Sequence, residues 1–176
     1  LAPIAVNSAF QLNGIVNLLT LVPTAGREAV SRESTSFVSK LISITDDIVA
    51  EEIAKYPLAN NSRELHAYIR NTRRYDLAGF IEIPVGKTEE SIRLKDVQKI
   101  IDGKNVYYFK GNNKDTIESL KDNSNLILTF SNDYNRAHIQ QQVLRQKSIP
   151  EMKDDEKKKK IYDDIDLTSE EIAILM

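Results

Sequence analysis

The stretch that decides the fold is Thr24–Tyr56, which reads TAGREAVSRESTSFVSKLISITDDIVAEEIAKY. Its apolar side chains recur at the three- and four-residue spacing of an amphipathic helix. One row consists of Val30, Phe37, Leu41, Ile44 and Ile48, and a second row beside it consists of Val38, Ile42, Val49, Ile53 and Tyr56. Two adjacent rows are wide enough to contact two neighbours, so the stretch predicts a bundle helix rather than one strand of a two-stranded coiled coil. The charged side chains Lys40, Asp47 and Glu51 are expected on its solvated side.

The preceding residues, Leu1–Gly26, contain no charged side chain, although 28% of the chain is charged. Asn7 or Ser8 can cap a helix that Pro23 would end. The apolar residues of this helix, among them Phe10, Leu18 and Leu19, would lie all round its axis. A helix that is apolar on every side has to be buried, within the chain or against a partner.

A third helix is predicted over Ser62–Leu77, where Asn61 and Glu64 have the spacing of a capping box. Beyond it the pattern changes to short β-branched or aromatic runs at 79–85, 106–109 and 126–130, which are typical of strands. Short helices are predicted at 91–102, 116–122 and 132–147. We therefore expect an α+β fold, with a helical bundle region at 1–78 and a small α+β region at 79–147.

The remaining residues, 148–176, are expected to form a flexible tail of mixed acidic and basic character. Their charged, low-complexity sequence cannot bury enough apolar surface to offset the entropy of ordering. The tail ends in Thr168-Ser-Glu-Glu171, a capping box that opens onto the apolar residues Ile172 and Leu175. A short helix after a flexible linker is typical of a docking segment, although it can also fold back onto the body of the chain.

Composition argues against most kinds of catalytic or metal chemistry. The chain has no cysteine and two histidines, His66 and His138, which have no ligand-spaced partner, so we expect no metal and no cofactor. The motif Gly86-Lys87-Thr88 follows a predicted strand, but a phosphate-binding loop needs glycine where this chain has Ile81. We find no catalytic constellation and predict that the protein is not an enzyme. The alternative of an enzyme with a dispersed active site stays open, because such a site leaves no motif in one sequence.

The predicted third helix carries a basic stripe, made of Arg63, His66, Arg70, Arg73 and Arg74. A stripe of this kind can contact phosphates, acidic partners or anionic lipid. The alternative, which we favour, is a solvated helix face whose charges pair with Glu64 and Asp76.

Net charge gives little support to a dedicated nucleic-acid binder. The chain carries −2, of which residues 151–176, with nine acidic and five basic side chains, contribute −4, so the remainder carries +2. A nucleic-acid binder is usually strongly basic. No transmembrane span is expected, because Pro3, Asn7 and Asn13 are among the residues that interrupt the uncharged stretch. The chain begins at Leu1, so we expect a processed or recombinant product, and an intracellular location is favoured without being established.

Together these patterns predict a non-enzymatic structural or interaction subunit of a larger protein assembly, homo- or hetero-oligomeric. The residues expected to contact partner proteins are Phe10, Leu18, Leu19, Phe37, Leu41, Ile44, Ile48, Ile172 and Leu175. The alternative is a nucleic-acid-associated protein that uses the basic stripe. The sequence does not identify the partners or their stoichiometry.

Overall fold

The computed structural model describes residues 4–24, 26, 29–86, 88–101, 105–110, 117 and 125–152. The chain divides into two compact units, Leu1–Phe80 and Ile81–Met176. The first unit is helical and the second combines short strands with helices, so the fold is α+β as the sequence predicts. Each unit has its own set of buried apolar side chains.

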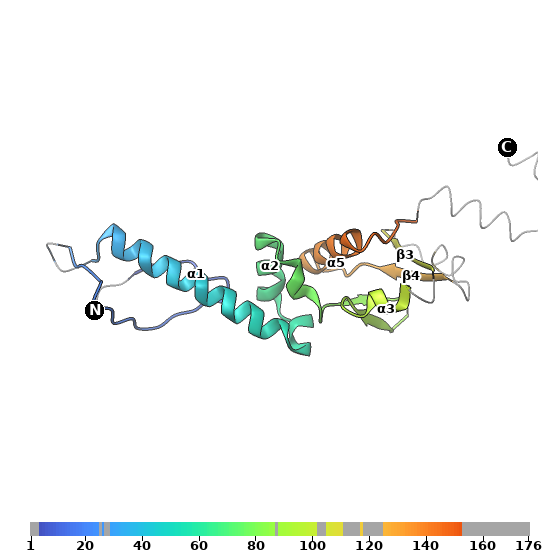
Figure 1. The fold of residues 1–176 in the computed structure, drawn as a ribbon, viewed down its shortest axis with the longest axis horizontal. Helices are drawn as coiled ribbons and strands as arrows, with labels where there is room; N and C mark the ends of the chain where they lie inside the picture. The colour runs from blue at the N-terminus through green and yellow to red at the C-terminus, as the bar shows by residue number, and fades with distance from the viewer. Residues whose placement is uncertain are drawn as a thin grey trace, which may run out of the picture. The chain divides into compact units, whose positions relative to one another are not determined.

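The first unit is built on helix α1, Arg32–Ala54 (Figure 1). The helix begins at Arg32 rather than at the predicted Thr24, because Ser31 caps it: the Ser31 hydroxyl accepts the backbone N–H of Ser34 at 3.2 Å. Before the cap, Pro23 and Val30 form an isolated antiparallel bridge. A bridged residue is not helical, so the described residues between Pro23 and Ser31 do not form the predicted first turns.

The predicted helix between Asn7 and Pro23 is wrong: residues 4–22 contain no helix and run beside α1 as an irregular segment (Figure 1). The Ser8 hydroxyl accepts the backbone N–H groups of Phe10 at 3.2 Å and Leu12 at 3.1 Å. Gln11 adopts a left-handed conformation with φ of 53°. A serine side chain that accepts hydrogen bonds from nearby backbone N–H groups competes with the hydrogen bonds of a helix.

After α1 the chain forms the 3₁₀ turn η1, Pro57–Asn60, helix α2, Arg63–Thr72, and the 3₁₀ turn η2, Tyr75–Ala78. Helix α2 is shorter than the predicted Ser62–Leu77. Ser62 caps its start by accepting the backbone N–H of Leu65, and Arg73 ends it in a left-handed conformation with φ of 59°. A left-handed residue after the last turn is a common way for a helix to stop.

The second unit contains two pairs of strands. Strands β1, Glu82–Pro84, and β2, Ser91–Arg93, form an antiparallel hairpin with Glu82 opposite Arg93. Strands β3, Asn105–Phe109, and β4, Asn125–Thr129, pair in parallel. A bridge between Val85 and Leu128 joins the two pairs. The predicted helix at 91–102 is wrong in its first part, which is β2, and only α3, Val97–Ile101, is helical.

Helix α5, Tyr134–Gln146, closes the second unit and is capped by Asp133, whose carboxylate accepts the Arg136 N–H at 2.9 Å. It confirms the helix predicted at 132–147. Fully buried core side chains of the unit come from β1, β4, α5 and the residues beside the hairpin, and they include Ile81, Ile83, Leu94, Leu128, Ile139 and Leu144. The helix predicted at 116–122 lies, apart from Ile117, outside the described residues.

The first residues of the predicted tail pack against the second unit. The backbone N–H of Tyr108 donates to the Pro150 carbonyl at 3.1 Å, and the N–H of Met152 donates back to the Tyr108 carbonyl at 3.0 Å. Ile149 and Met152 are buried. This differs from the flexible segment predicted from Ser148, because an edge of β3 supplies backbone partners that the local sequence does not reveal.

Candidate interaction surface

Two adjacent carboxylates of α1, Asp46 and Asp47, attach its neighbours to one side of the helix. Asp46 is buried and accepts hydrogen bonds from the Ser8 hydroxyl at 2.7 Å and the Ala9 backbone N–H at 2.9 Å. Asp47 accepts a hydrogen bond from the hydroxyl of Tyr68 in α2. Hydrogen bonds to an ionised acceptor are stronger than those between neutral groups. The pair therefore fixes both the N-terminal segment and α2 on α1.

The Tyr68 side chain links these neighbours to one another. Its ring packs against Phe10 of the N-terminal segment, with 5.6 Å between the ring centroids. Burial raises the pKa of Tyr68 to about 12, and the hydrogen bond to Asp47 acts in the same direction. Ionisation would place a phenolate beside a carboxylate in a partly dry environment, which both effects oppose. Tyr68 therefore remains a neutral donor at ordinary pH.

On the other side of α1, one apolar row is left uncovered by the described residues. Phe37, Ile44 and Ile48 have exposed fractions of 44%, 55% and 60%, and Leu41 between them is half-buried. At 100° per residue these four side chains fall within an arc of about 60°. We call Phe37, Leu41, Ile44 and Ile48 the outer row. The sequence predicts that it faces neighbours, and in the structure no described element covers it.

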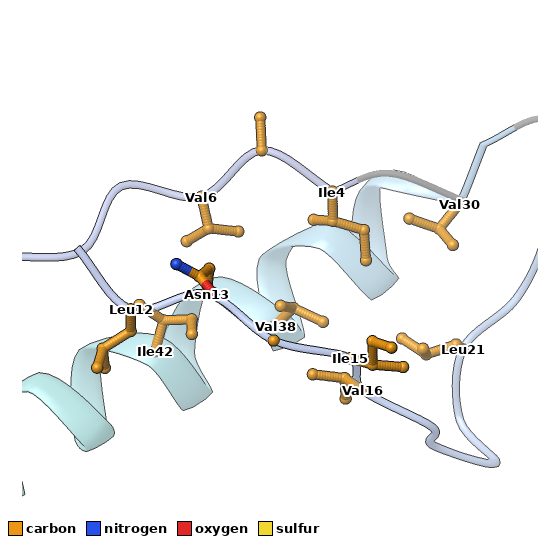
Figure 2. Close-up of a pocket in the computed structure, with 12 residues that line it drawn as sticks. Ile4, Val6, Leu12, Asn13, Ile15, Val16, Leu21, Val30, Val38 and Ile42 are labelled. Carbon is orange, nitrogen blue, oxygen red and sulfur yellow. The ribbon is translucent and has the colours of Figure 1, made fainter. Parts of the chain in front are cut away.

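A cavity of about 460 Å³ lies between the N-terminal segment and α1. Figure 2 shows the segment passing the helix twice, with Ile4 and Val6 on one pass and Leu12 and Ile15 on the other. Helix α1 contributes Val38 and Ile42. Apart from the Asn13 amide the lining side chains are aliphatic, so they provide apolar contact and no acid, base or nucleophile.

The structure separates the other residues predicted to contact partners. Phe10 is half-buried against Tyr68 and serves the fold of the first unit. Leu18 is half-buried, whereas Leu19 is fully exposed. Ile172 and Leu175 lie outside the described residues. Among the described residues of the predicted set, Leu19, Phe37, Ile44 and Ile48 are thus exposed, and Leu41 is half-buried between the last three.

The predicted basic stripe is not a single surface. His66 is 4% exposed and its Nε2 lies 3.0 Å from the Ala59 carbonyl oxygen, so its prediction as a surface contact is wrong: it is a core residue that joins α2 to η1. Arg74 lies beyond the end of α2 and forms ion pairs with Asp76 at 2.9 Å and Glu51 at 3.2 Å. These carboxylates raise the pKa of Arg74, and Arg74 lowers the pKa of Asp76.

The other three arginines of the stripe differ in exposure. Arg63 and Arg73 are exposed, and Arg70 is half-buried with its guanidinium donating to the Asn71 side-chain oxygen at 3.2 Å. Arg73 is the left-handed residue that ends α2, so its side chain leaves the helix differently from those of the other two. Arg63 and Arg70 thus lie on helix α2, and Arg73 lies at its end.

Sequence reasoning missed Asp46, and it assigned Asp47 and Glu51 to the solvated side of α1. In the structure all three bond to residues far away in the chain: Ser8, Tyr68 and Arg74. One signal was available for Asp46. At 100° per residue it lies about 20° from Ile53, at the border of the second apolar row, and a carboxylate at such a position needs hydrogen-bond donors when it is buried. The sequence offers no comparable signal for the identity of those donors.

No other chemical site emerges among the described residues. They contain no cluster of three or more histidine or carboxylate side chains that could hold a metal ion. Of the helices in the described part of the chain, none is long and apolar enough to cross a membrane. No protein-family model, no curated protein and no solved structure gives a significant match to this chain.

Proposed function

We propose that this protein is a non-enzymatic subunit of a larger protein assembly and that it contacts its partner through the outer row of α1. The observation that carries the proposal is a continuous line of four large apolar side chains, three of them 44–60% exposed, on one face of a 23-residue helix. Single exposed apolar residues are normal, but a contiguous apolar patch marks an interaction site. We propose an interaction role because the side chains of this surface are apolar, and apolar side chains bind a partner through burial.

The outer row can support a contact of moderate strength. Full burial of an isoleucine, leucine or phenylalanine side chain is worth about 1.5–3 kcal/mol. The side chains of the outer row are already partly covered, so each would gain roughly 1 kcal/mol when a partner covers the rest. The row would then contribute a few kcal/mol to association, which is enough to select a partner and too little to hold it without flanking polar contacts.

The test compares two double variants of the full chain that differ in the side of α1 they change. Phe37→Asp/Ile44→Asp places two charges in the outer row. Ser36→Asp/Ser43→Asp places the same two charges, with the same seven-residue spacing, at exposed positions outside the row. Both pairs carry the same helix-propensity cost, so a difference between them reports on the surface.

Each tagged variant is expressed in the native source and purified gently, with nuclease, and the masses of the co-purified proteins are determined. We expect the wild type and the serine variant to retain a stoichiometric protein complex that the outer-row variant loses. If all three retain the same proteins, or if the wild type retains none, the proposal is wrong.

A further inference from the structure

Resting on this proposed function, we propose that the partner is a second copy of the same chain, whose α1 packs antiparallel against the first. The residues of the outer row are spaced by four, three and four positions, an order that reads the same in both directions. A two-fold axis between residues 42 and 43 therefore places Phe37 opposite Ile48 of the partner subunit. It places Leu41 opposite Ile44 of the partner subunit.

This arrangement makes the row complementary to itself. A two-fold interface uses the same patch on both chains, so every contact is formed twice. The two helices would form four layers, each made of two facing side chains. Every layer pairs a side chain from one half of the row with one from the other half, and all of these side chains are apolar. Antiparallel packing also sets the large Phe37 ring beside a branched isoleucine instead of beside a second phenylalanine. Such pairing of unlike shapes lets neighbouring layers interdigitate.

The charges beside the row favour the antiparallel direction. At 100° per residue, Lys40 and Asp47 lie on the same side of the row. The two-fold axis brings the level of Lys40 within roughly 3 Å, along the helix axis, of Asp47 of the partner subunit. A parallel pair would instead bring Asp47 toward Glu52 of the partner subunit. Opposite charges beside an apolar seam stabilise a pairing and like charges destabilise it, which sets the orientation.

Like charges approach one another at the ends of the row, and neighbouring cations offset them in part. Glu33 of the partner subunit reaches the level of Glu51, but Glu51 is already paired with Arg74 at 3.2 Å. Lys55 lies one turn further on, paired with Glu52 at 2.6 Å. The like charges of Glu33 and Glu51 therefore meet in a group that also contains two cations.

The length of the row limits the strength of the dimer. Residues 37–48 span about 17 Å of helix, and interfaces below about 1,200 Å² are typical of weak or transient complexes. We therefore expect a reversible dimer whose dissociation constant is roughly 1–100 µM. This range defines the concentrations at which the association has to be measured.

Sedimentation velocity of the purified full chain across this range measures the association directly. The wild type is expected to shift from the monomer mass to twice that mass as concentration rises. Phe37→Asp/Ile44→Asp should weaken the dimer at least tenfold, while Ser36→Asp/Ser43→Asp should stay within twofold of the wild type. Circular dichroism checks that all three chains are equally helical. A wild type that stays monomeric throughout, or an equal loss in both variants, overturns the inference.

Disulfide trapping tests the direction, because the chain contains no cysteine of its own. In the antiparallel pair, a mixture of Phe37→Cys and Ile48→Cys chains should form a mixed disulfide. Phe37→Cys alone should not, since the two copies of residue 37 would lie roughly 16 Å apart along the axis, beyond the roughly 7 Å between Cα atoms that a disulfide spans. Efficient cross-linking of Phe37→Cys alone would overturn the antiparallel arrangement.

The two proposals fail in different ways. If the purified chain is monomeric but the native complex contains a different protein that is lost in Phe37→Asp/Ile44→Asp, the second-copy inference is wrong and the proposed function stands. If the purified chain is monomeric and the native source yields no complex, both are wrong. A dimer that the outer-row substitutions abolish supports both.

Discussion

At the scale of single residues, Gln140 shows how a polar side chain can organise a core. It has no exposed surface, yet its amide is satisfied: the NH₂ group donates to the Glu82 carbonyl at 2.6 Å, and the oxygen accepts the Ser131 N–H at 2.9 Å. The side chain thereby connects helix α5 with strand β1 and with the end of β4. A buried amide in a sheet-and-helix core is stable only with such partners.

We predict that Gln140→Ala lowers the free energy of unfolding by roughly 2–4 kcal/mol. The substitution leaves the Ser131 N–H without its acceptor and opens a cavity, and each of these effects costs on the order of 1–3 kcal/mol. Urea unfolding measures the change. The matched control is Gln146→Ala, an exposed glutamine of the same helix, which should change stability by less than about 0.5 kcal/mol. Equal effects at the two positions would contradict the bonding described for Gln140.

Tyr68 provides a prediction about pH. Its folded pKa, about 12, is raised by burial and by Asp47 above the value of about 10 expected in the unfolded chain. The protonated phenol therefore stabilises the fold fully below pH 10, and this contribution is lost as pH rises from 10 to 12. Tyr68→Phe should cost roughly 1–2 kcal/mol at pH 8, since it removes a hydrogen bond to a carboxylate.

The difference in unfolding free energy between wild type and Tyr68→Phe should shrink between pH 10 and pH 12. Urea unfolding at pH 8, 10 and 11 follows it. Because both chains contain the same lysines and the same remaining tyrosines, their shared alkaline titrations cancel in the difference. A difference that stays constant up to pH 11 would show that the Tyr68 pKa is not raised.

At the scale of elements, those with strong local signals were predictable from the sequence. The two apolar rows predicted α1, and Leu126–Phe130 predicted β4. The N-terminal segment was mispredicted because an apolar stretch without charges favours a buried helix by composition alone. In the structure this segment is held by Asp46, which accepts hydrogen bonds from Ser8 and Ala9, 38 and 37 positions away in sequence. No local pattern contains that pairing.

Strand β2 was missed for a related reason. Ser91–Arg93 is too short to have a periodicity of its own, and it is a strand because β1 pairs with it in register. The residues of the candidate interaction surface likewise divide into those that local spacing identifies and those that depend on tertiary contacts. The outer row follows from spacing within α1, so the sequence identified its four residues. His66 was assigned to the surface because helical spacing places it beside the arginines, and the burial that α2 and η1 impose on it is a tertiary effect.

The attachment of the N-terminal segment can be tested at this scale. Asp46→Asn keeps the size of the side chain but removes its charge and replaces one of its two acceptor oxygens with an NH₂ donor, so the Ser8 hydroxyl and the Ala9 N–H no longer each have an acceptor oxygen. We expect amide exchange in residues 4–24 to become at least tenfold faster, since a lost charge-assisted bond costs roughly 1.5–3 kcal/mol and local opening follows that cost. Exchange in α5 should stay unchanged. Glu33→Gln, which removes an exposed charge from the same helix, is the control.

At the scale of the whole molecule, charge determines which partners the surface can attract from a distance. The chain carries −2 at neutral pH, and the structure reduces the basic stripe further by burying His66 and pairing Arg74 with two carboxylates. Affinity for nucleic acid depends mainly on the number of phosphates that lysine and arginine neutralise. Three arginines in an acidic molecule provide few such contacts.

We therefore predict that the full chain binds single- and double-stranded oligonucleotides no more tightly than a dissociation constant of roughly 100 µM at physiological salt, the weak limit of non-specific association. Fluorescence anisotropy at several salt concentrations measures the affinity. The competing hypothesis, a nucleic-acid-associated protein, expects tighter binding that falls steeply with salt and is lost in Arg63→Glu/Arg70→Glu. Lys95→Glu/Lys99→Glu makes the same change of charge at exposed positions of the second unit. Binding that survives this control but not the arginine reversal would contradict our prediction, because a general loss of positive charge would weaken both variants alike.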